Sequence, residues 1–171
     1  EMVITTNGGL WRYRIGDVVR FTSLSPFRIQ IIGRTKHFIN AFGEEVVIEN
    51  TDRAIEEASL KTGVKIVDYT VAPIYMSTNN SKGSHQWLIE FKDAPSDLDT
   101  FSKMLDQKLR DLNSDYDAKR HKDITMTGPK ISVAKKGLFD KWLRNYNKIG
   151  GQHKIQRLSN DRIFIENLLK I

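Results

Sequence analysis

Short runs of apolar and β-branched residues, separated by polar turn residues, fill the first part of the chain. Runs of this kind between turn signals predict β-strands. We expect strands at residues 2–6, 10–15, 18–23 and 27–32. The pair Asn7-Gly8 between the first two predicts a two-residue hairpin, because both residues tolerate a positive φ. The first residues are therefore expected to form a small antiparallel β unit.

Apolar residues that recur every three to four positions predict helices in the remainder of the chain. The pattern places these helices at residues 47–60, 98–112, 138–146 and 163–169. The apolar face of the first helix is expected to include Leu60, and Gly63 is well placed to end that helix. Ser96 is expected to cap the second helix, and Asn160 or Asp161 the last.

Further strands are predicted between these helices. They are placed at residues 38–42, 65–76, 86–91 and 124–133. The polar cluster at residues 77–84 is typical of a turn, which makes its two flanking strands a hairpin. The order of elements contains no internal repeat. It predicts an α+β fold in which helices pack on one face of a mixed β-sheet.

The charge of the chain is positive but dispersed. It has 27 Lys and Arg against 21 Asp and Glu, which gives a net charge of +6. An excess of positive charge favours polyanions such as nucleic acid or nucleotide phosphates. The basic residues are spread among the acids, and the charged residues 115–123 are interpreted as a solvent-exposed face. A nucleic-acid partner is therefore not expected, although a basic α+β module that binds nucleic acid stays as an alternative.

Other features of the composition exclude whole classes of site. The chain has no cysteine, which excludes structural disulfides and Cys-ligated zinc and fits a cytoplasmic location. Its four histidines lack the spacing of a protein metal site. No apolar run approaches the about 20 residues that span a bilayer, so no membrane partner is expected.

The most specific motif is the run Leu-Trp-Arg-Tyr-Arg-Ile-Gly-Asp-Val at residues 10–18, followed by a strand that leads into Gly33-Arg34. This order resembles the adenylate-forming enzymes. Its narrower form is similar to the Leu-Tyr-Arg-Tyr-Arg-Val-Gly-Asp-Val signature of the acyl-acid amido synthetases of the Gretchen Hagen 3, or auxin-responsive promoter, family. A second run, Gly-Gln-His-Lys-Ile-Gln-Arg at residues 151–157, is similar to that family's Gln-(aromatic or His)-Lys-x-Pro-Arg segment. Gln156 departs from it, because the family usually has proline there.

The resemblance implies a division of the chain. Residues 1–32 would be the terminal β segment of the large adenylate-forming domain, residues 33–36 a hinge, and residues 37–171 the small, mobile C-terminal domain. The opening Glu-Met-Val-Ile-Thr-Thr enters within a predicted strand, and the chain contains no Gly/Ser/Thr-rich loop for ATP phosphates. We therefore expect a piece of a longer polypeptide that is inactive by itself.

The resemblance also implies roles for individual residues. Asp17 would bind the ribose hydroxyls of ATP, since a carboxylate accepts strong hydrogen bonds from vicinal hydroxyls. The alternative is a turn aspartate that bonds its own backbone. Arg34 would steady the nucleotide near the hinge, with a surface ion pair as its alternative. Tyr13 would flank the adenine or lie in the core.

Lys154 would stabilise the negative charge that builds up as pyrophosphate leaves. Lys130 and the pair Lys135-Lys136 compete for this role, but they lack the Gln-x-Lys-x-x-Arg context.

The implied activity is the ATP-dependent adenylation of a carboxylic acid, followed by acyl transfer to an amine or amino acid. Mg²⁺ would arrive with ATP rather than at a site built from protein ligands. The implied partners are the acid, the amine or amino acid, and the missing N-terminal domain of the same chain. An acyl-CoA ligase of the same superfamily, with a thiol acceptor, is the alternative enzyme.

Overall fold

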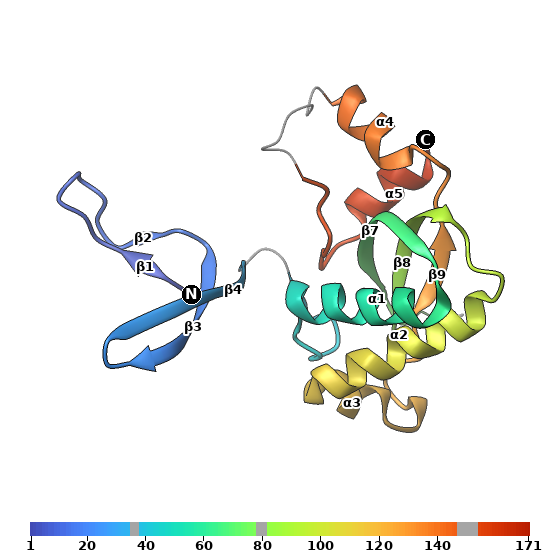
Figure 1. Cartoon of the computed structure of the whole chain (residues 1–171), viewed down its shortest axis with the longest axis horizontal. Helices are drawn as coiled ribbons and strands as arrows, with labels where there is room; N and C mark the ends of the chain where they lie inside the picture. The colour runs from blue at the N-terminus through green and yellow to red at the C-terminus, as the bar shows by residue number, and fades with distance from the viewer. Residues whose placement is uncertain (35–37, 78–81, 147–153) are drawn as a thin grey trace.

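The computed structural model describes residues 1–34, 38–77, 82–146 and 154–171. Figure 1 shows a small β unit formed by the first strands and a larger part that holds all the helices. The predicted α+β class is confirmed.

The N-terminal β unit consists of two antiparallel pairs. Strand β1 (Val3–Ile4) pairs with β2 (Tyr13–Arg14), and β3 (Asp17–Leu24) pairs with β4 (Phe27–Arg34). The antiparallel pairing was predicted from the sequence, but the two-residue hairpin was wrong. The backbone N–H of Thr6 bonds the carbonyl of Leu10 at 2.9 Å, so the loop holds three residues instead of two, and the positive φ of 98° falls on the third of them, Gly9.

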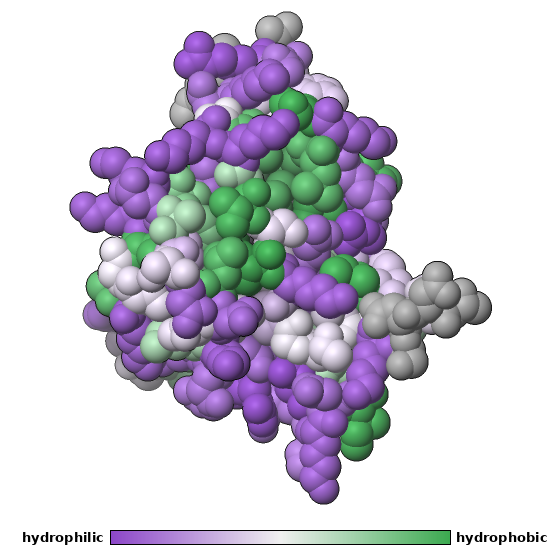
Figure 2. All heavy atoms as spheres, turned by 90° about the vertical axis from the view of Figure 1, so that its right-hand side faces the viewer, coloured by the Kyte–Doolittle hydropathy of each residue, from purple (hydrophilic) through white to green (hydrophobic). Residues whose placement is uncertain are grey.

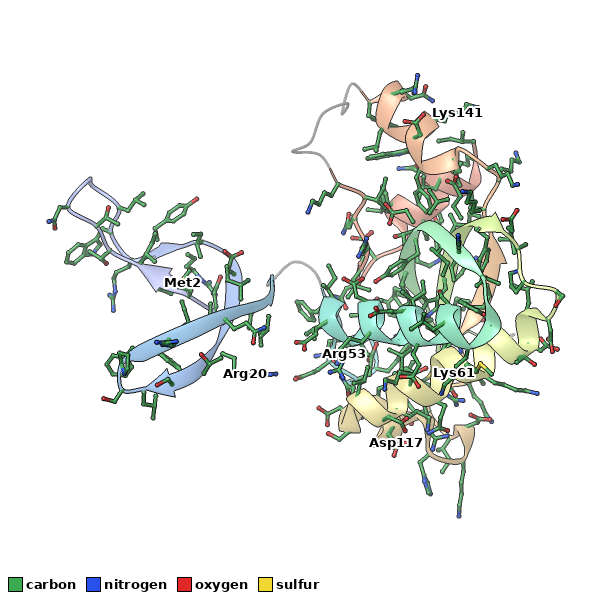
Figure 3. All side chains as sticks on the ribbon, in the orientation of Figure 1. Met2, Arg20, Arg53, Lys61, Asp117 and Lys141 are labelled. Atoms are coloured by element: carbon green, nitrogen blue, oxygen red, sulfur yellow. The ribbon has the colours of Figure 1, made fainter. Side chains whose placement is uncertain are left out.

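The β3–β4 hairpin exposes apolar side chains. Phe21 is 59% exposed, Phe27 77% and Ile31 60%. Figure 3 shows this hairpin apart from the helices of the larger part. A two-stranded hairpin is at best marginally stable by itself in water, and these apolar side chains add little to its stability while they stay exposed.

A three-stranded mixed sheet forms the centre of the larger part. Strands β7 (Lys65–Ile74) and β8 (Ser84–Asp93) are antiparallel, and β9 (Lys130–Val133) pairs with β8 in parallel. The predicted hairpin and mixed sheet are thus confirmed, whereas β9 is shorter than predicted. A separate antiparallel pair, β5 (Phe38–Ile39) with β6 (Val46–Val47), precedes the first helix.

Helices cover both faces of this sheet. Helices α1 (Ile48–Thr62) and α2 (Leu98–Leu112) share one apolar core with Tyr69 and Trp87, whereas α4 (Leu138–Asn145) and α5 (Ile163–Leu169) share another with Ala72 and Leu88. The expectation of helices on one face was wrong. Alternate residues of β7 and β8 face opposite layers: Tyr69 and Trp87 face α1 and α2, whereas Ala72 and Leu88 face α4 and α5 together with the buried polar Glu90.

Nearby residues determine where α1 ends, which of its side chains are buried, and how α2 begins. Helix α1 ends at Gly63 in the left-handed conformation, as predicted. Leu60 is 77% exposed and not part of the apolar face, because it lies about 200° around the helix from the buried Ala58. The side chain of Asp97, rather than the expected Ser96, accepts the backbone N–H groups of Asp99 and Thr100 at the start of α2.

The charged residues 115–123 form helix α3 (Ser114–Arg120) and a short 3-10 turn (His121–Asp123). Their interpretation as a solvated face was wrong for Arg120, which is 8% exposed. Its guanidinium donates to both carboxylate oxygens of Asp106 on α2, at 2.9 and 2.7 Å. A buried charge of this kind needs such a partner.

Candidate functional site

Asp17 and Arg34 lie opposite each other at the open end of the β3–β4 hairpin. Asp17 begins β3, Arg34 ends β4, and the strand register pairs the two residues directly. Gly16 has φ of 85°, a left-handed conformation that turns the chain into β3 at little cost for glycine. Asp17 is 8% exposed, and its carbonyl accepts the backbone N–H of Met2 at 2.8 Å. The structure therefore brings together two residues that the sequence motifs had singled out separately.

Tyr13 lies in β2 of the same unit, where it pairs with Ile4. Its side chain is 51% exposed, so it does not belong to a core among the described residues. An aromatic ring with an open face is suited to contact a flat partner such as a purine base.

Lys154 is exposed and lies in the larger part of the molecule, next to the buried Ile155. Figure 1 shows the chain after residue 153 in a different part of the molecule from the β unit. The other residues of its motif at positions 151–153 are outside the described residues. The competing Lys130 lies at the start of β9, and Lys135 and Lys136 precede α4.

The sequence reasoning missed a buried acid–base pair beside the strand that follows the proposed hinge. Glu44, in the loop between β5 and β6, is 0% exposed, and His85 of β8 is 1% exposed. Glu44 Oε1 lies 2.8 Å from His85 Nε2, and the backbone N–H groups of Ala41 and Phe42 donate to the same carboxylate at 3.2 and 2.6 Å. The aromatic rings of Phe42 and Tyr116 flank the imidazole. The only sequence signal was an acid directly after a turn glycine, which is too common to be read as a buried pair.

The electrostatics of Glu44 favour its charged form. Burial raises the pKa of its carboxyl, but the hydrogen bond and charge of His85 and the N–H of Phe42 outweigh burial, so the pKa is lower than the ordinary 4.5. This carboxylate fixes the loop at residues 40–45 onto β8.

We expect stability to decrease in acid because of this group. The pKa of Glu44 is lower in the folded than in the unfolded chain. The stability that it contributes is therefore complete above its unfolded pKa and is lost as the pH falls through the lowered value. Urea denaturation of the wild type and Glu44→Gln between pH 7 and pH 3 measures this, and the difference between them should shrink at the acid end. A difference that stays constant over this range would contradict it.

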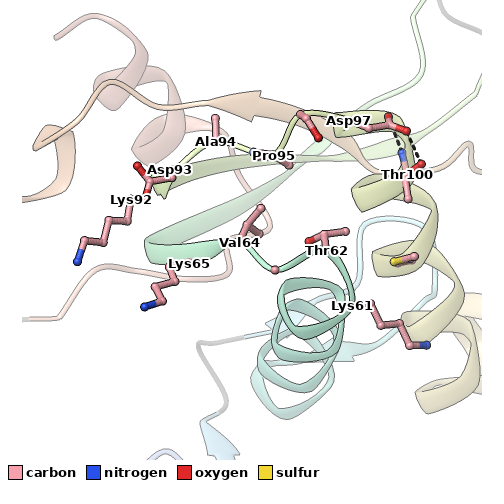
Figure 4. Close-up of a pocket in the computed structure, with 13 residues that line it drawn as sticks. Lys61, Thr62, Val64, Lys65, Lys92, Asp93, Ala94, Pro95, Asp97 and Thr100 are labelled. Carbon is pink, nitrogen blue, oxygen red and sulfur yellow. Dashed lines mark hydrogen bonds between the residues drawn. The ribbon is translucent and has the colours of Figure 1, made fainter.

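Two of the clefts that border the larger part include no candidate residue among their described lining. One, of about 360 Å³, adjoins the Glu44 loop at Phe42 and Tyr75. The other, of about 590 Å³, lies between the end of α1 and the start of α2, and Figure 4 shows Lys61, Lys65 and Lys92 at its border. Figure 2 shows mainly hydrophilic side chains around a central apolar area on the side that faces right in Figure 1.

Neither a metal site nor a membrane-spanning helix is found among the described residues. No group of three or more His, Cys, Asp or Glu residues within the described ranges is arranged to hold a metal ion. No helix in those ranges is long and apolar enough to cross a membrane.

Comparison with known proteins places these features in one family. The sequence matches the GH3 family C-terminal domain over residues 49–163 and the GH3 family central domain over residues 1–34. It is 28% identical over 151 residues to the indole-3-acetic acid-amido synthetase GH3.4 of Arabidopsis thaliana, covering 82% of this chain and 25% of that protein. It is 30% identical over 172 residues to the jasmonoyl-L-amino acid synthetase GH3.5 of Oryza sativa subsp. japonica, covering 94% of this chain and 28% of that protein.

A solved structure shares the fold. The GH3.15 acyl acid amido synthetase superposes with a TM-score of 0.74 at 23% identity, covering 98% of this chain and 31% of that chain. The chain thus spans about a quarter to a third of the length of the relatives it matches. Because the C-terminal domain match alone takes in more than half of the residues, the chain belongs to the GH3 family.

Proposed function

We propose that the chain is the C-terminal part of an ATP-dependent acyl-acid amido synthetase. In the first step, the carboxylate of an acid attacks the α-phosphate of ATP and pyrophosphate leaves. In the second, an amine attacks the acyl carbon, AMP leaves, and the amine nitrogen loses a proton. The observation that carries this proposal is that two successive domains of one family match at residues 1–34 and 49–163, with a candidate nucleotide residue in the first part and Lys154 in the second.

The residues present suit these steps. Asp17 is a buried carboxylate at a strand start, suited to accept hydrogen bonds from the two ribose hydroxyls. Arg34, its partner across the hairpin, would steady the nucleotide, and Tyr13 would flank the adenine. Lys154 offers an exposed ammonium group, which stabilises developing negative charge without losing a proton. Mg²⁺ would arrive bound to the phosphates of ATP.

The proposed division of the chain follows the same evidence. Residues 1–32 would complete the large domain, residues 33–36 would act as the hinge, and residues 37–171 would move as the small domain. The exposed apolar side chains of the β3–β4 hairpin support this division, since large exposed apolar surfaces mark contacts with a partner. Here the partner would be the rest of the large domain, in a cytoplasmic protein.

The reaction class is tested on the full-length protein. Pyrophosphate release is measured over a panel of carboxylic acids, and acyl transfer is then measured with amino acids, other amines and coenzyme A. We expect release that requires both acid and ATP, and transfer to the amine nitrogen. Transfer to the thiol would instead establish an acyl-CoA ligase. Absence of release with every acid, together with salt-dependent nucleic-acid binding, would establish a basic binding module. The 171 residues alone should release no pyrophosphate.

Asp17→Asn should raise the KM for ATP in the full-length protein by about tenfold or more, because a neutral amide replaces charge-assisted hydrogen bonds to the ribose. The KM for the acid should change little. The matched control is Asp93→Asn, which changes an exposed aspartate at the end of β8. If both variants keep the wild-type KM for ATP, Asp17 does not bind the nucleotide.

A further inference from the structure

The segment that follows Lys154 has no helix or long strand of its own, but it lies alongside β7. Val71 of β7 donates its N–H to the carbonyl of Arg157 at 2.7 Å and accepts the N–H of Ser159 at 3.1 Å. Leu158 and Val71 form a parallel β-bridge. Thr70 Oγ1 donates to the carbonyl of Gln156 at 2.7 Å. The backbone after Lys154 is therefore fixed against the sheet edge, while Lys154 itself is exposed.

The side chain of Arg157 is directed to the body of the domain. Its Nη1 donates to Asp52 Oδ1 of α1 at 2.6 Å, and its Nε lies 3.5 Å from Asp68 Oδ1 of β7. The guanidinium carbon lies 5.0 Å from the ring centroid of Tyr69, in a cation–π contact. Residues 154–160 are called the lysine segment below. One planar guanidinium thus joins this segment to two elements that are far away in sequence.

A direct contact between Arg157 and an anionic substrate is disfavoured by its surroundings. The adjoining cleft, of about 410 Å³, is lined by Asp52, Glu56 and Asp68 as well as Arg157. Three carboxyl groups against one guanidinium do not attract phosphate or carboxylate. The Arg157 side chain instead holds its own segment to α1 and β7.

We propose that Arg157 is a positioning residue for Lys154: it fixes the lysine segment to α1 and β7, so that the ammonium group is presented in one geometry. This inference rests on the proposed function for its catalytic consequence.

Gln156 increases the need for such a tether. In similar segments of the family, proline at this position restricts the backbone. Here the Gln156 side chain donates to the carbonyl of Leu158 at 3.3 Å, which is a long and weak substitute. Side-chain contacts of the segment therefore add to its two backbone hydrogen bonds with Val71 in fixing its position.

Asn160 provides a second, independent attachment. Its Oδ1 accepts the N–H of Asn40 at 2.7 Å, and its Nδ2 donates to the carbonyl of Phe38 at 3.1 Å. These two residues lie in and beside β5, directly after the proposed hinge. The lysine segment is thus joined both to α1 and to the first strand of the larger part, so that Lys154 would follow any movement of that strand.

The kinetic test uses the full-length protein and a double-mutant cycle. Arg157→Gln should lower kcat for acid-dependent pyrophosphate release by about ten- to a hundredfold, as small displacements of catalytic groups do. The KM values for ATP and acid should stay within about twofold, since neither is contacted. Asp52→Asn should have a similar effect on kcat, and the double variant should be no slower than Arg157→Gln alone.

The conservative variant and the control complete the set. Arg157→Lys keeps the charge, and its kcat should fall between those of the wild type and Arg157→Gln. Arg144→Gln, which breaks the exposed pair with Asp140 on α4, is the matched control and should change nothing.

A second readout reports the segment itself. Trypsin cleavage after Lys154 in the folded full-length protein, followed by mass spectrometry, should be about tenfold faster in Arg157→Gln than in the wild type or Arg144→Gln, because local opening exposes the bond. The proposal would be overturned if cleavage stayed unchanged in Arg157→Gln. It would also be overturned if the rate losses of Asp52→Asn and Arg157→Gln multiplied in the double variant. If Lys154→Ala leaves pyrophosphate release unchanged, the assigned role of Lys154 is wrong, and cleavage still decides whether Arg157 fixes the segment.

Discussion

Lys154→Ala in the full-length protein is expected to lower kcat for acid-dependent pyrophosphate release by a factor of about 10² to 10³. This is the loss observed when one group that stabilises developing negative charge is removed. The KM for ATP should change much less, because the lysine is proposed to act when charge develops during the reaction rather than in nucleotide binding. Release is measured at saturating ATP and acid.

Exposed lysines elsewhere on the domain provide the controls. Lys130→Ala and Lys136→Ala change exposed side chains at β9 and before α4. Both should retain nearly the wild-type kcat. Since Lys154 is also exposed, its removal should change the free energy of unfolding by no more than about 0.5 kcal/mol, so the rate loss would not reflect unfolding. A loss in the Lys130 or Lys136 variant, with full activity in Lys154→Ala, would reassign the catalytic lysine.

Glu44→Ala is expected to lower the free energy of unfolding by about 3–5 kcal/mol, as measured by urea denaturation at neutral pH. The truncation leaves the imidazole of His85 and the N–H groups of Ala41 and Phe42 without their carboxylate partner, in a site that excludes water. Glu45→Ala is a matched control, because it removes the adjacent exposed acid, and it should cost less than about 0.5 kcal/mol. A loss of less than about 1 kcal/mol for Glu44→Ala would show that the pair contributes little.

Local patterns in the sequence predicted the elements better than their arrangement. The end of α1 at Gly63 and the β7–β8 hairpin follow from residues that are neighbours along the chain, and both were predicted. The second helical layer was not, because the face of the sheet that it covers mixes Leu88 with polar residues such as Thr70 and Glu90, a pattern typical of a solvent-facing side. Arg120 appeared to be one charge in a polar run, since its partner Asp106 lies on another helix.

The candidate site shows the same limit. The motifs identified Asp17 and Arg34 separately, but only the strand register places them opposite each other. The lysine motif contained Arg157, yet its partner Asp52 lies more than 100 positions earlier, in a helix whose sequence gives no sign of this contact. Such long-range contacts depend on tertiary packing, which a single sequence does not encode in any local pattern.

The bridge between Leu158 and Val71 has a consequence for the order in which the domain can fold. During synthesis, β7 and β8 emerge early and can pair as a local hairpin, but the outer edge of β7 stays open until Leu158 has left the ribosome. An open strand edge is a template for wrong pairing between chains. Contacts of such high sequence separation also form slowly. A nascent chain that ends before residue 158 should therefore be more prone to aggregate than one that extends through residue 171, and the lysine segment also protects the outer edge of β7.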